Sequence, residues 1–225
     1  AVSHDLRTPL TGIGTAGEAL ASPNLTGQER VELAAAVTSE ADRLARLVDK
    51  LLDLSRLQGG VADPRPEWSS VEEVLRVAIS ETPHPAGFNV GIDPDLPLVR
   101  ADAAQLERAF ANLLENAARY SGDNPVAVRA RVVGHRMLIR IVDRGPGIPG
   151  RELERIFEAF HRGPRARGVE THVGSGLGLA VVRGFVEANG GRVWAESLPG
   201  QGATFVVELP LEAAQVREQV AGGTA

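Results

Sequence analysis

A histidine beside a carboxylate opens the chain, in the segment Ser3-His4-Asp5-Leu6-Arg7-Thr8-Pro9-Leu10. A neutral imidazole is a competent phosphoryl acceptor near pH 7, because its unperturbed pKa is about 6.5. Asp5 can hold the reactive tautomer of His4 or accept its proton. Thr8 lies four residues on, on the same helix face, where its hydroxyl can position water for hydrolysis of a phosphorylated histidine. A single histidine on a helix is more often structural, so this segment needs support from other motifs.

Two asparagines and an arginine share one side of a helix-forming segment, residues 112–121. Asn112, Asn116 and Arg119 follow one another at steps of four and three residues. Mg²⁺ prefers oxygen ligands and keeps several waters and phosphate oxygens. The amide oxygen of Asn116 therefore suits a nucleotide-bridged Mg²⁺, while Arg119 can meet a phosphate. The alternative is a helix whose amides merely face solvent, which two Asn in an otherwise Leu/Ala helix make less attractive.

An aspartate ends an apolar strand and leads into a Gly-Pro-Gly turn. Asp143 shares strand parity with Ile139 and Ile141, so its carboxylate is expected on an apolar face. A buried carboxylate needs a donor, and the exocyclic amine of adenine can supply one. Gly145 and Gly147 permit close approach of a ring. Asp-Gly turns after strands are common, so this motif alone is weak.

A glycine-rich segment, Gly174-Ser175-Gly176-Leu177-Gly178-Leu179, opens another helix. Consecutive backbone N–H groups at a helix N-terminus suit phosphates. The segment does not follow a strand, as a dinucleotide fingerprint requires. It ends a polar stretch, Arg162 to Val173, which is expected to form a mobile lid. Phe157 and Phe160 are expected to anchor the near end of this lid, although core packing explains them equally well.

These groups need helices and strands to position them. Residues 1–58 predict two helices, the second of which starts at a capping box of Thr26 and Glu29. The second helix carries an apolar stripe of Leu33, Val37, Leu44, Leu47, Val48, Leu51, Leu54 and Leu57. A stripe of this length needs a partner helix, which favours dimerisation through the hairpin. The alternative is an ordinary hairpin inside a larger domain.

The remainder alternates helical and strand patterns. Gly, Pro and Asp predict a linker over residues 59–66. Residues 67–212 then carry expected helices at 71–80, 103–120 and 175–189, and expected strands at 126–132, 137–143, 192–197 and 203–209. The predicted fold class is α+β, in which a helical hairpin precedes a two-layer α/β sandwich with helices on one face of a mixed sheet. Residues 213–225 are expected to form a loose tail.

Composition excludes several classes of function. The net charge of -5 argues against a nucleic-acid-binding protein, which usually presents a basic face. The absence of cysteine excludes disulfides, zinc thiolates and cysteine nucleophiles. No apolar run approaches the roughly 18 residues that span a bilayer.

The ordered set of motifs resembles the H, N, G1, F and G2 boxes of bacterial sensor histidine kinases of two-component systems. The resemblance extends from Ser3 to about Pro210. It implies that residues 1–58 form the dimerisation and phosphoacceptor (HisKA) hairpin, a four-helix bundle in the dimer, truncated here at its N-terminus. It implies that residues 67–212 form an ATP-binding (HATPase) domain of the Bergerat or GHKL type.

The resemblance also implies roles for individual residues. His4, Asp5 and Thr8 would be catalytic, Asn116 would ligate Mg²⁺, and Asp143 with Gly145 and Gly147 would read adenine. Phosphates would be held by Gly174, Ser175, Gly176, Leu177, Gly178 and Leu179. Further implied nucleotide neighbours are Asn112, Arg119, Tyr120, Arg162 and Thr204.

The expected activity is ATP- and Mg²⁺-dependent autophosphorylation of His4, followed by transfer to an aspartate on the receiver domain of a response regulator. Phosphatase activity in the reverse direction is also expected. The chain would be the cytoplasmic portion of an inner-membrane sensor whose sensing and membrane parts lie upstream. Residues 65–68, 95–102 and 112–121 are similar to the KdpD-type potassium-responsive kinases.

Two other readings stay open at the level of sequence. A GHKL-type ATPase or serine-directed protein kinase would share the nucleotide motifs without needing His4. A non-catalytic signalling dimer would retain the fold with a decayed site, which the five intact motifs disfavour.

Overall fold

The computed structural model describes residues 2–59, 63–162 and 175–212, except for the side chains of Val2 and His4. The expected tail, most of the expected lid and Gly174 therefore lie outside the described residues. None of the helices in these ranges combines the length and apolar character that crossing a membrane requires.

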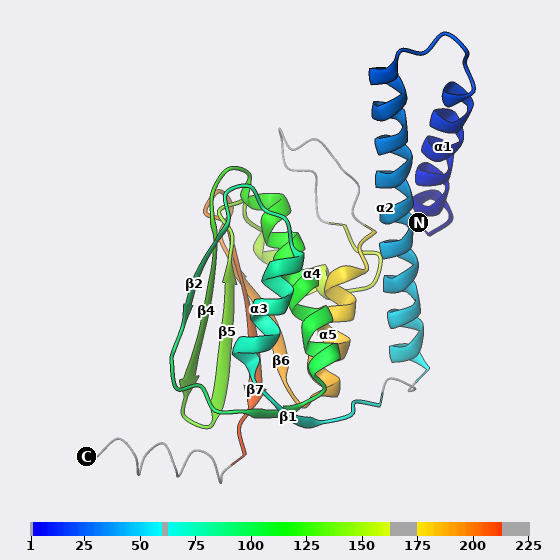
Figure 1. Ribbon diagram of the computed structural model, residues 1–225. Helices are drawn as coiled ribbons and strands as arrows, with labels where there is room; N and C mark the ends of the chain where they lie inside the picture. Colours follow the sequence, from blue (N-terminus) through cyan, green and yellow to red (C-terminus); the bar gives the residue numbers. More distant parts are fainter. Residues whose placement is uncertain (1, 60–62, 163–174, 213–225) are drawn as a thin grey trace.

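An N-terminal helical hairpin stands beside an α/β sandwich (Figure 1). Helix α1 spans Val2–Leu20 and helix α2 spans Gly27–Gln58. The predicted capping box is confirmed, because the Thr26 hydroxyl accepts from the Glu29 amide and the Glu29 carboxylate accepts from the Thr26 amide. These hydrogen bonds lower the pKa of Glu29 and fix where α2 begins.

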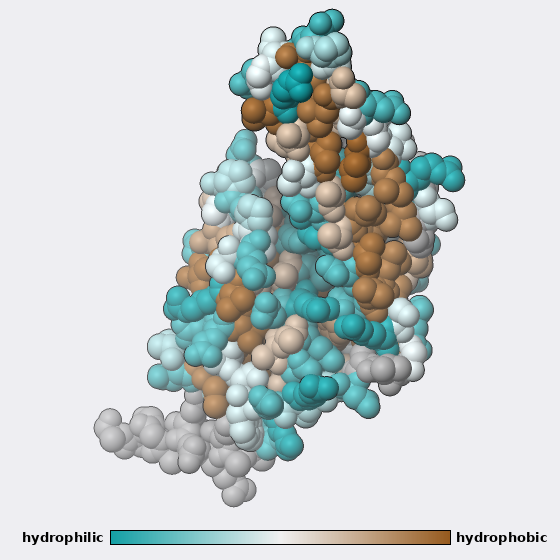
Figure 2. All heavy atoms as spheres, turned by 45° about the vertical axis from the view of Figure 1, so that its right-hand side comes forward, coloured by the Kyte–Doolittle hydropathy of each residue, from teal (hydrophilic) through white to brown (hydrophobic). Residues whose placement is uncertain are grey.

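Apolar side chains remain exposed along the hairpin, as Figure 2 shows. Leu10 on α1 is 54% exposed, and Val31 and Leu52 on α2 are 65% and 51% exposed. An exposed apolar strip of this kind marks a contact surface. The sandwich does not cover it, because α2 turns a different face toward α5.

The sandwich has a mixed five-stranded sheet covered by helices on one face (Figure 1). Its strands in spatial order are β2 (Phe88–Ile92), β4 (Val126–Val133), β5 (Arg136–Val142), β7 (Ala203–Pro210) and β6 (Arg192–Ser197). Only the β2–β4 pair is parallel. The covering helices are α3 (Val71–Glu81), α4 (Ala103–Ser121) and α5 (Gly178–Ala188).

Smaller elements complete the sandwich. Strands β1 (Glu67–Ser69) and β3 (Val99–Ala101) form a separate antiparallel pair. Two 3₁₀ turns, η1 (Gly150–Glu152) and η2 (Arg155–Phe157), follow β5.

The core lies between the sheet and its helices. Val126, Val128 and Ala130 alternate inward along β4, and Met137, Ile139 and Ile141 do so along β5. They meet the buried face of α4, whose members include Leu106, Phe110 and Leu113. The predicted two-layer architecture is therefore confirmed.

Three of the strands were not predicted from the sequence. Strand β2 is an edge strand whose three central residues are exposed. Its apolar Phe88, Val90 and Ile92 alternate with Asn89 and Gly91 over only five positions, and Asn and Gly are depleted in strands. Strands β1 and β3 have three residues each. Helix α5 begins at Gly178, three residues later than predicted, because Gly176 has φ of 68° and cannot belong to a right-handed helix.

Candidate functional site

The histidine segment lies in the first turns of α1, next to the sandwich. His4 belongs to this helix, and its side chain is outside the described part of the chain. The carboxylate of Asp5 is buried and forms an ion pair with the guanidinium of Arg162. Thr8 lies one turn later on the exposed side of α1. The structure thus brings Asp5, a predicted catalytic residue, against Arg162, a predicted nucleotide neighbour that is distant in the sequence.

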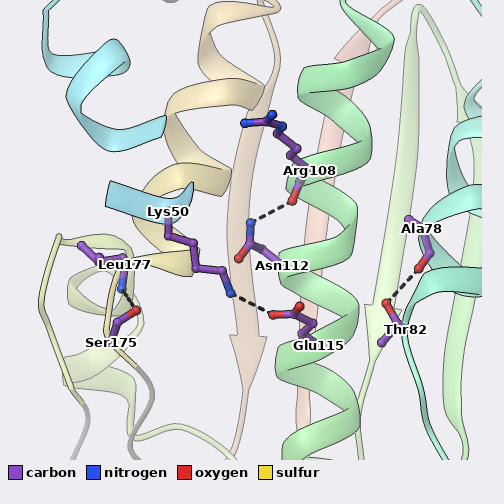
Figure 3. A network of polar contacts seen from close by, with 8 residues as sticks. All are labelled: Lys50, Ala78, Thr82, Arg108, Asn112, Glu115, Ser175 and Leu177. Atoms are coloured by element: carbon purple, nitrogen blue, oxygen red, sulfur yellow. Dashed lines mark hydrogen bonds and ion pairs between the residues drawn. The ribbon is translucent and has the colours of Figure 1, made fainter. Parts of the chain in front are cut away.

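The first asparagine of α4 is buried beside the start of α5. The Asn112 amide nitrogen donates to the Arg108 carbonyl at 2.8 Å (Figure 3). Its oxygen Oδ1 is buried and has no hydrogen-bond partner among the described residues. A side chain at Gly178 would place its Cβ 3.0 Å from this oxygen. An unsatisfied buried acceptor is costly, and this oxygen can accept a hydrogen bond from a bound ligand or coordinate a cation.

The rest of the asparagine motif faces increasingly toward solvent. Asn116, one turn after Asn112, is half-buried. Arg119 and Tyr120 are exposed at the end of α4. The predicted roles of these three residues at a nucleotide site stay predictions.

The glycine-rich segment is tied to the residues that precede the expected lid. The Phe160 amide donates to the Gly176 carbonyl at 2.9 Å. A Cβ at Gly176 would lie 2.7 Å from the carbonyl oxygen of His161. Phe160 itself adopts φ of 65°, a conformation rare outside glycine. This arrangement brings the two flanks of the segment 163–174 together.

The leucines of the glycine-rich segment serve packing. Leu177 is buried, and its amide donates to the Ser175 hydroxyl at 3.4 Å (Figure 3). Leu179 packs against the core. The side chains of these leucines therefore shape the start of α5, and only backbone groups and Ser175 are left to contact a ligand.

Asp143 is buried at the end of β5 with one oxygen engaged. Its Oδ1 accepts from the amides of Gly145 at 2.8 Å and Ala203 at 3.1 Å. Its Oδ2 has no hydrogen-bond partner among the described residues. Burial raises the pKa of Asp143 from its ordinary value of 3.8, against the two amide hydrogen bonds that lower it. The second oxygen is therefore held ready for an external donor. Thr204 is half-buried next to Ala203 on β7.

The glycines after Asp143 meet protein on the side where a side chain would lie. Gly147 has φ of 74°, and a Cβ there would overlap the carbonyl oxygen of Leu198. A Cβ at Gly145 would lie 2.8 Å from the Tyr120 carbonyl oxygen. Both glycines thus allow the turn to pack against α4 and the β6–β7 hairpin. The predicted approach of a ligand ring to these glycines stays a prediction.

Sequence reasoning missed the residues that hold this turn. The Ser197 hydroxyl accepts from the Ile148 amide at 2.8 Å and donates to the Gly202 carbonyl at 2.6 Å. A serine in a hairpin carries no distinguishing pattern. Only the Gly-Gln-Gly sequence of the hairpin turn could have indicated a tight contact.

A second missed pair supports the residues before the lid. His161 Nε2 lies 2.7 Å from the carboxylate of the buried Glu152. Arg151 and Arg155 each lie 3.7 Å from the same carboxylate. This cluster anchors the backbone at Phe160 and His161, on which Gly176 rests.

The oxygen donors suit a metal that brings most of its own ligands. Among the described residues no group of three or more His, Cys, Asp or Glu side chains is arranged to hold an ion. Asn112 provides a neutral oxygen beside the start of α5, and Asn116 follows one turn later on α4. Mg²⁺ bound through phosphate oxygens needs no more than one or two protein ligands, so these residues fit it.

Comparison with known families matches both halves of the chain. Residues 101–213 match the "Histidine kinase-, DNA gyrase B-, and HSP90-like ATPase" family, and residues 1–60 match the "His Kinase A (phospho-acceptor) domain". The sensor protein KdpD of Mycobacterium tuberculosis is 40% identical over 218 residues, which cover 93% of this chain. The chain spans 25% of the length of that relative.

Solved structures agree in fold. Full-length ShkA in complex with AMPPNP is 34% identical with a TM-score of 0.65, over 92% of this chain and 44% of that one. ThkA in complex with the response regulator protein TrrA is 21% identical with a TM-score of 0.67, over 94% of this chain and 60% of that one, which shows a shared fold. With a phosphoacceptor hairpin, an ATPase sandwich and five motifs in the expected order, the chain belongs to the sensor histidine kinases.

Proposed function

We propose that this chain is a kinase core that transfers the γ-phosphoryl group of ATP to His4 and then to an aspartate of a response regulator. One observation carries the proposal. Asp5, the neighbour of His4, is ion-paired with Arg162, the first residue of the expected lid. The acceptor helix and the nucleotide half of the same chain therefore meet where the transfer must take place.

The nucleotide is proposed to bind between α4, α5 and the end of β5. The free oxygen of Asp143 accepts a hydrogen bond from the exocyclic amine of adenine, which selects adenine over guanine. The backbone at Gly176 and Gly178 and the N-terminus of α5 face the phosphates. Asn116 is the proposed Mg²⁺ ligand, supported by the buried oxygen of Asn112 one turn earlier.

The chain's own residues then align the transfer. Asp5 orients the imidazole of His4 and takes the proton that the ring loses when its nitrogen bonds to phosphorus. The bond that breaks joins the γ-phosphorus to the oxygen of the leaving ADP. Arg162 keeps Asp5 in place. When bound, Mg²⁺ offsets the negative charge of the transferring phosphoryl group. Thr8, on the same face of α1, positions water for the phosphatase direction.

Two partners are proposed, a second copy of the chain and a response regulator. The exposed apolar strip of the hairpin, which includes Leu10, Val31 and Leu52, suits a second copy of the chain. ThkA, which shares this fold, is described in complex with a response regulator protein, and a receiver domain is the proposed acceptor here. We assign the chain to the cytoplasmic part of a KdpD-type sensor, with residues 1–58 as hairpin, 59–66 as linker and 67–212 as ATP-binding domain.

The test is incubation of the chain with γ-labelled ATP and Mg²⁺. We expect acid-labile, alkali-stable label that His4→Gln abolishes while ATP binding persists. His135→Gln, at an exposed histidine, is the matched control and should label normally. Label retained in His4→Gln would refute the assignment. Acid-stable phosphoserine or free phosphate alone would instead favour the serine-kinase or ATPase reading.

A further inference from the structure

Helix α2 turns a second, separate stripe toward the nucleotide half of the chain. Lys50, Asp53 and Leu57 follow one another at steps of three and four residues, which places them on one helix face. Asp53 is ion-paired with Arg108 of α4, and burial raises the pKa of Asp53. The side chain of Leu57 covers Gly184 of α5, where a Cβ would lie 2.5 Å from it.

Lys50 occupies the end of this stripe nearest the proposed phosphate site. Its ammonium lies 2.8 Å from the carboxylate of Glu115 (Figure 3). Glu115 directly precedes Asn116, the proposed Mg²⁺ ligand. It also lies three residues after Asn112, whose buried oxygen faces the start of α5. Along the axis of α4, Glu115 is therefore about 4.5 Å from Asn112 and about 1.5 Å from Asn116.

The charge of Glu115 works against the proposed ligand. A carboxylate next to the binding site of a polyanion repels it, and the repulsion is screened only weakly because the group is partly buried. The side chains of Lys50 and Glu115 are 21% and 33% exposed. Lys50 neutralises this carboxylate. It is the only lysine of the chain, and it comes from the hairpin.

We infer that Lys50 is a positioning residue which the hairpin contributes to the nucleotide site, so that ATP affinity depends on the docking of α2. The inference rests on the proposed function, because it takes ATP as the ligand. Coupling between binding events is reciprocal. Bound ATP therefore favours the docked hairpin by the same factor by which docking strengthens ATP binding.

A purely structural ion pair makes a different prediction. If Lys50 and Glu115 only fasten α2 to α4, loss of either partner weakens docking, and loss of both does so as well. If Lys50 acts by neutralising Glu115, removal of the carboxylate makes the lysine dispensable for ATP binding. The double variant Lys50→Met/Glu115→Gln separates the two cases, since it lacks the ion pair but leaves no uncompensated carboxylate.

The test is calorimetric titration of the full chain with MgATP. Lys50→Met should weaken ATP binding at least about fivefold, the lower end of typical site-to-site coupling. Lys50→Arg should bind like the unchanged protein, and Lys50→Met/Glu115→Gln should recover to within about twofold. The matched control is Arg46→Met, which removes one positive charge from an exposed position one turn earlier on α2. It should leave ATP affinity unchanged.

Two other outcomes would overturn either the inference alone or the proposed function as well. Unchanged ATP affinity in Lys50→Met, or a double variant as weak as the single one, would overturn the inference and leave the proposed function standing. Failure of the unchanged protein to bind ATP would overturn the proposed function, and the inference with it.

Discussion

The carboxylate of Asp5 and the guanidinium of Arg162 form an ion pair although 157 positions separate them in the sequence. The aspartate is buried, while the arginine remains partly exposed. This pair connects the residue next to His4 with the first residue of the expected lid. It links the acceptor helix directly to the nucleotide half of the chain.

Loss of this pair is expected to affect transfer more than ATP binding. Arg162→Met removes the partner that orients Asp5, and misplacement of a catalytic group commonly lowers rates by one to two orders of magnitude. We expect the labelling rate of His4 at saturating ATP to fall roughly tenfold or more, with ATP affinity changed less than about threefold. Arg131→Met, on an exposed strand position, is the control. A weakened ATP affinity with an unchanged rate would make Arg162 a nucleotide ligand instead.

The Mg²⁺ assignment can be tested at Asn116. Asn116→Asp keeps the shape of the side chain but adds a negative charge beside the phosphates. We expect Mg²⁺-dependent ATP binding and phosphorylation both to be lost. Asn24→Asp adds the same charge in the exposed turn between α1 and α2 and should leave both intact. Unchanged turnover in Asn116→Asp would remove this residue from the site.

Asp143→Asn should weaken ATP binding while it keeps the hydrogen bonds that hold the turn. The asparagine oxygen can still accept from Gly145 and Ala203, but its nitrogen cannot accept from adenine. Loss of a hydrogen bond to a charged group is worth about 1.5–3 kcal/mol, so we expect ATP affinity to fall roughly tenfold to a hundredfold. Titration with MgATP at neutral pH measures this change. Asp123→Asn, at an exposed position, is the control and should bind normally.

The same variant gives a pH-dependent stability difference. Burial raises the pKa of Asp143 above 3.8 in the folded chain, so the folded state holds this proton more tightly than the unfolded chain. The stabilisation from the protonated form is complete below pH 3.8 and is lost as pH rises through the folded pKa. At neutral pH, Asp143→Asn should therefore unfold at an equal or higher temperature. This gain should shrink on acidification, and a gain that grows at low pH would contradict it.

The contact between Leu57 and Gly184 can be tested by enlarging the glycine and then shortening the leucine. Gly184→Ala crowds Leu57 and should cost about 1–3 kcal/mol of unfolding free energy. Adding Leu57→Ala should recover part of this loss, with a coupling of at least about 0.5 kcal/mol in denaturant unfolding. Gly17→Ala, a helix glycine with open space beside it, should be neutral or slightly stabilising. Additive losses in the double variant would mean that α2 does not dock through this contact.

The turn after Asp143 provides a test of backbone packing. Gly147 and Gly134 both have positive φ, 74° and 60°, but only Gly147 faces other atoms within 4 Å. Gly134→Ala should cost about 1–2 kcal/mol from the left-handed conformation alone. Gly147→Ala should cost more in the same denaturant measurement, because its Cβ would overlap the Leu198 carbonyl. Equal losses of unfolding free energy in the two variants would show that the β6–β7 hairpin can move away from residue 147.

The sequence by itself determined the motifs, their order and most of the elements that carry them. Residues 71–80 and 103–120 show helical periodicity strong enough to place α3 and α4 within one residue at their C-terminal ends. Alternation along 126–132 located β4 for the same reason. These patterns are local, since each side chain's environment repeats with the period of its own helix or strand. Edge strand β2 alternates over five positions only, and its Asn and Gly are depleted in strands, so the same signal was too weak to predict it.

Only the tertiary structure decided which distant residues meet. The pairs Asp5–Arg162, Lys50–Glu115 and Ser197–Ile148 join segments with no shared periodicity. A charged residue on an exposed helix position looks the same whether or not a partner lies opposite. The role of Gly147 was likewise decided by its neighbour, because a glycine permits close approach without specifying what approaches. Proximity depends on how α2 and the β6–β7 hairpin pack against the sandwich, and that packing is a property of the whole fold.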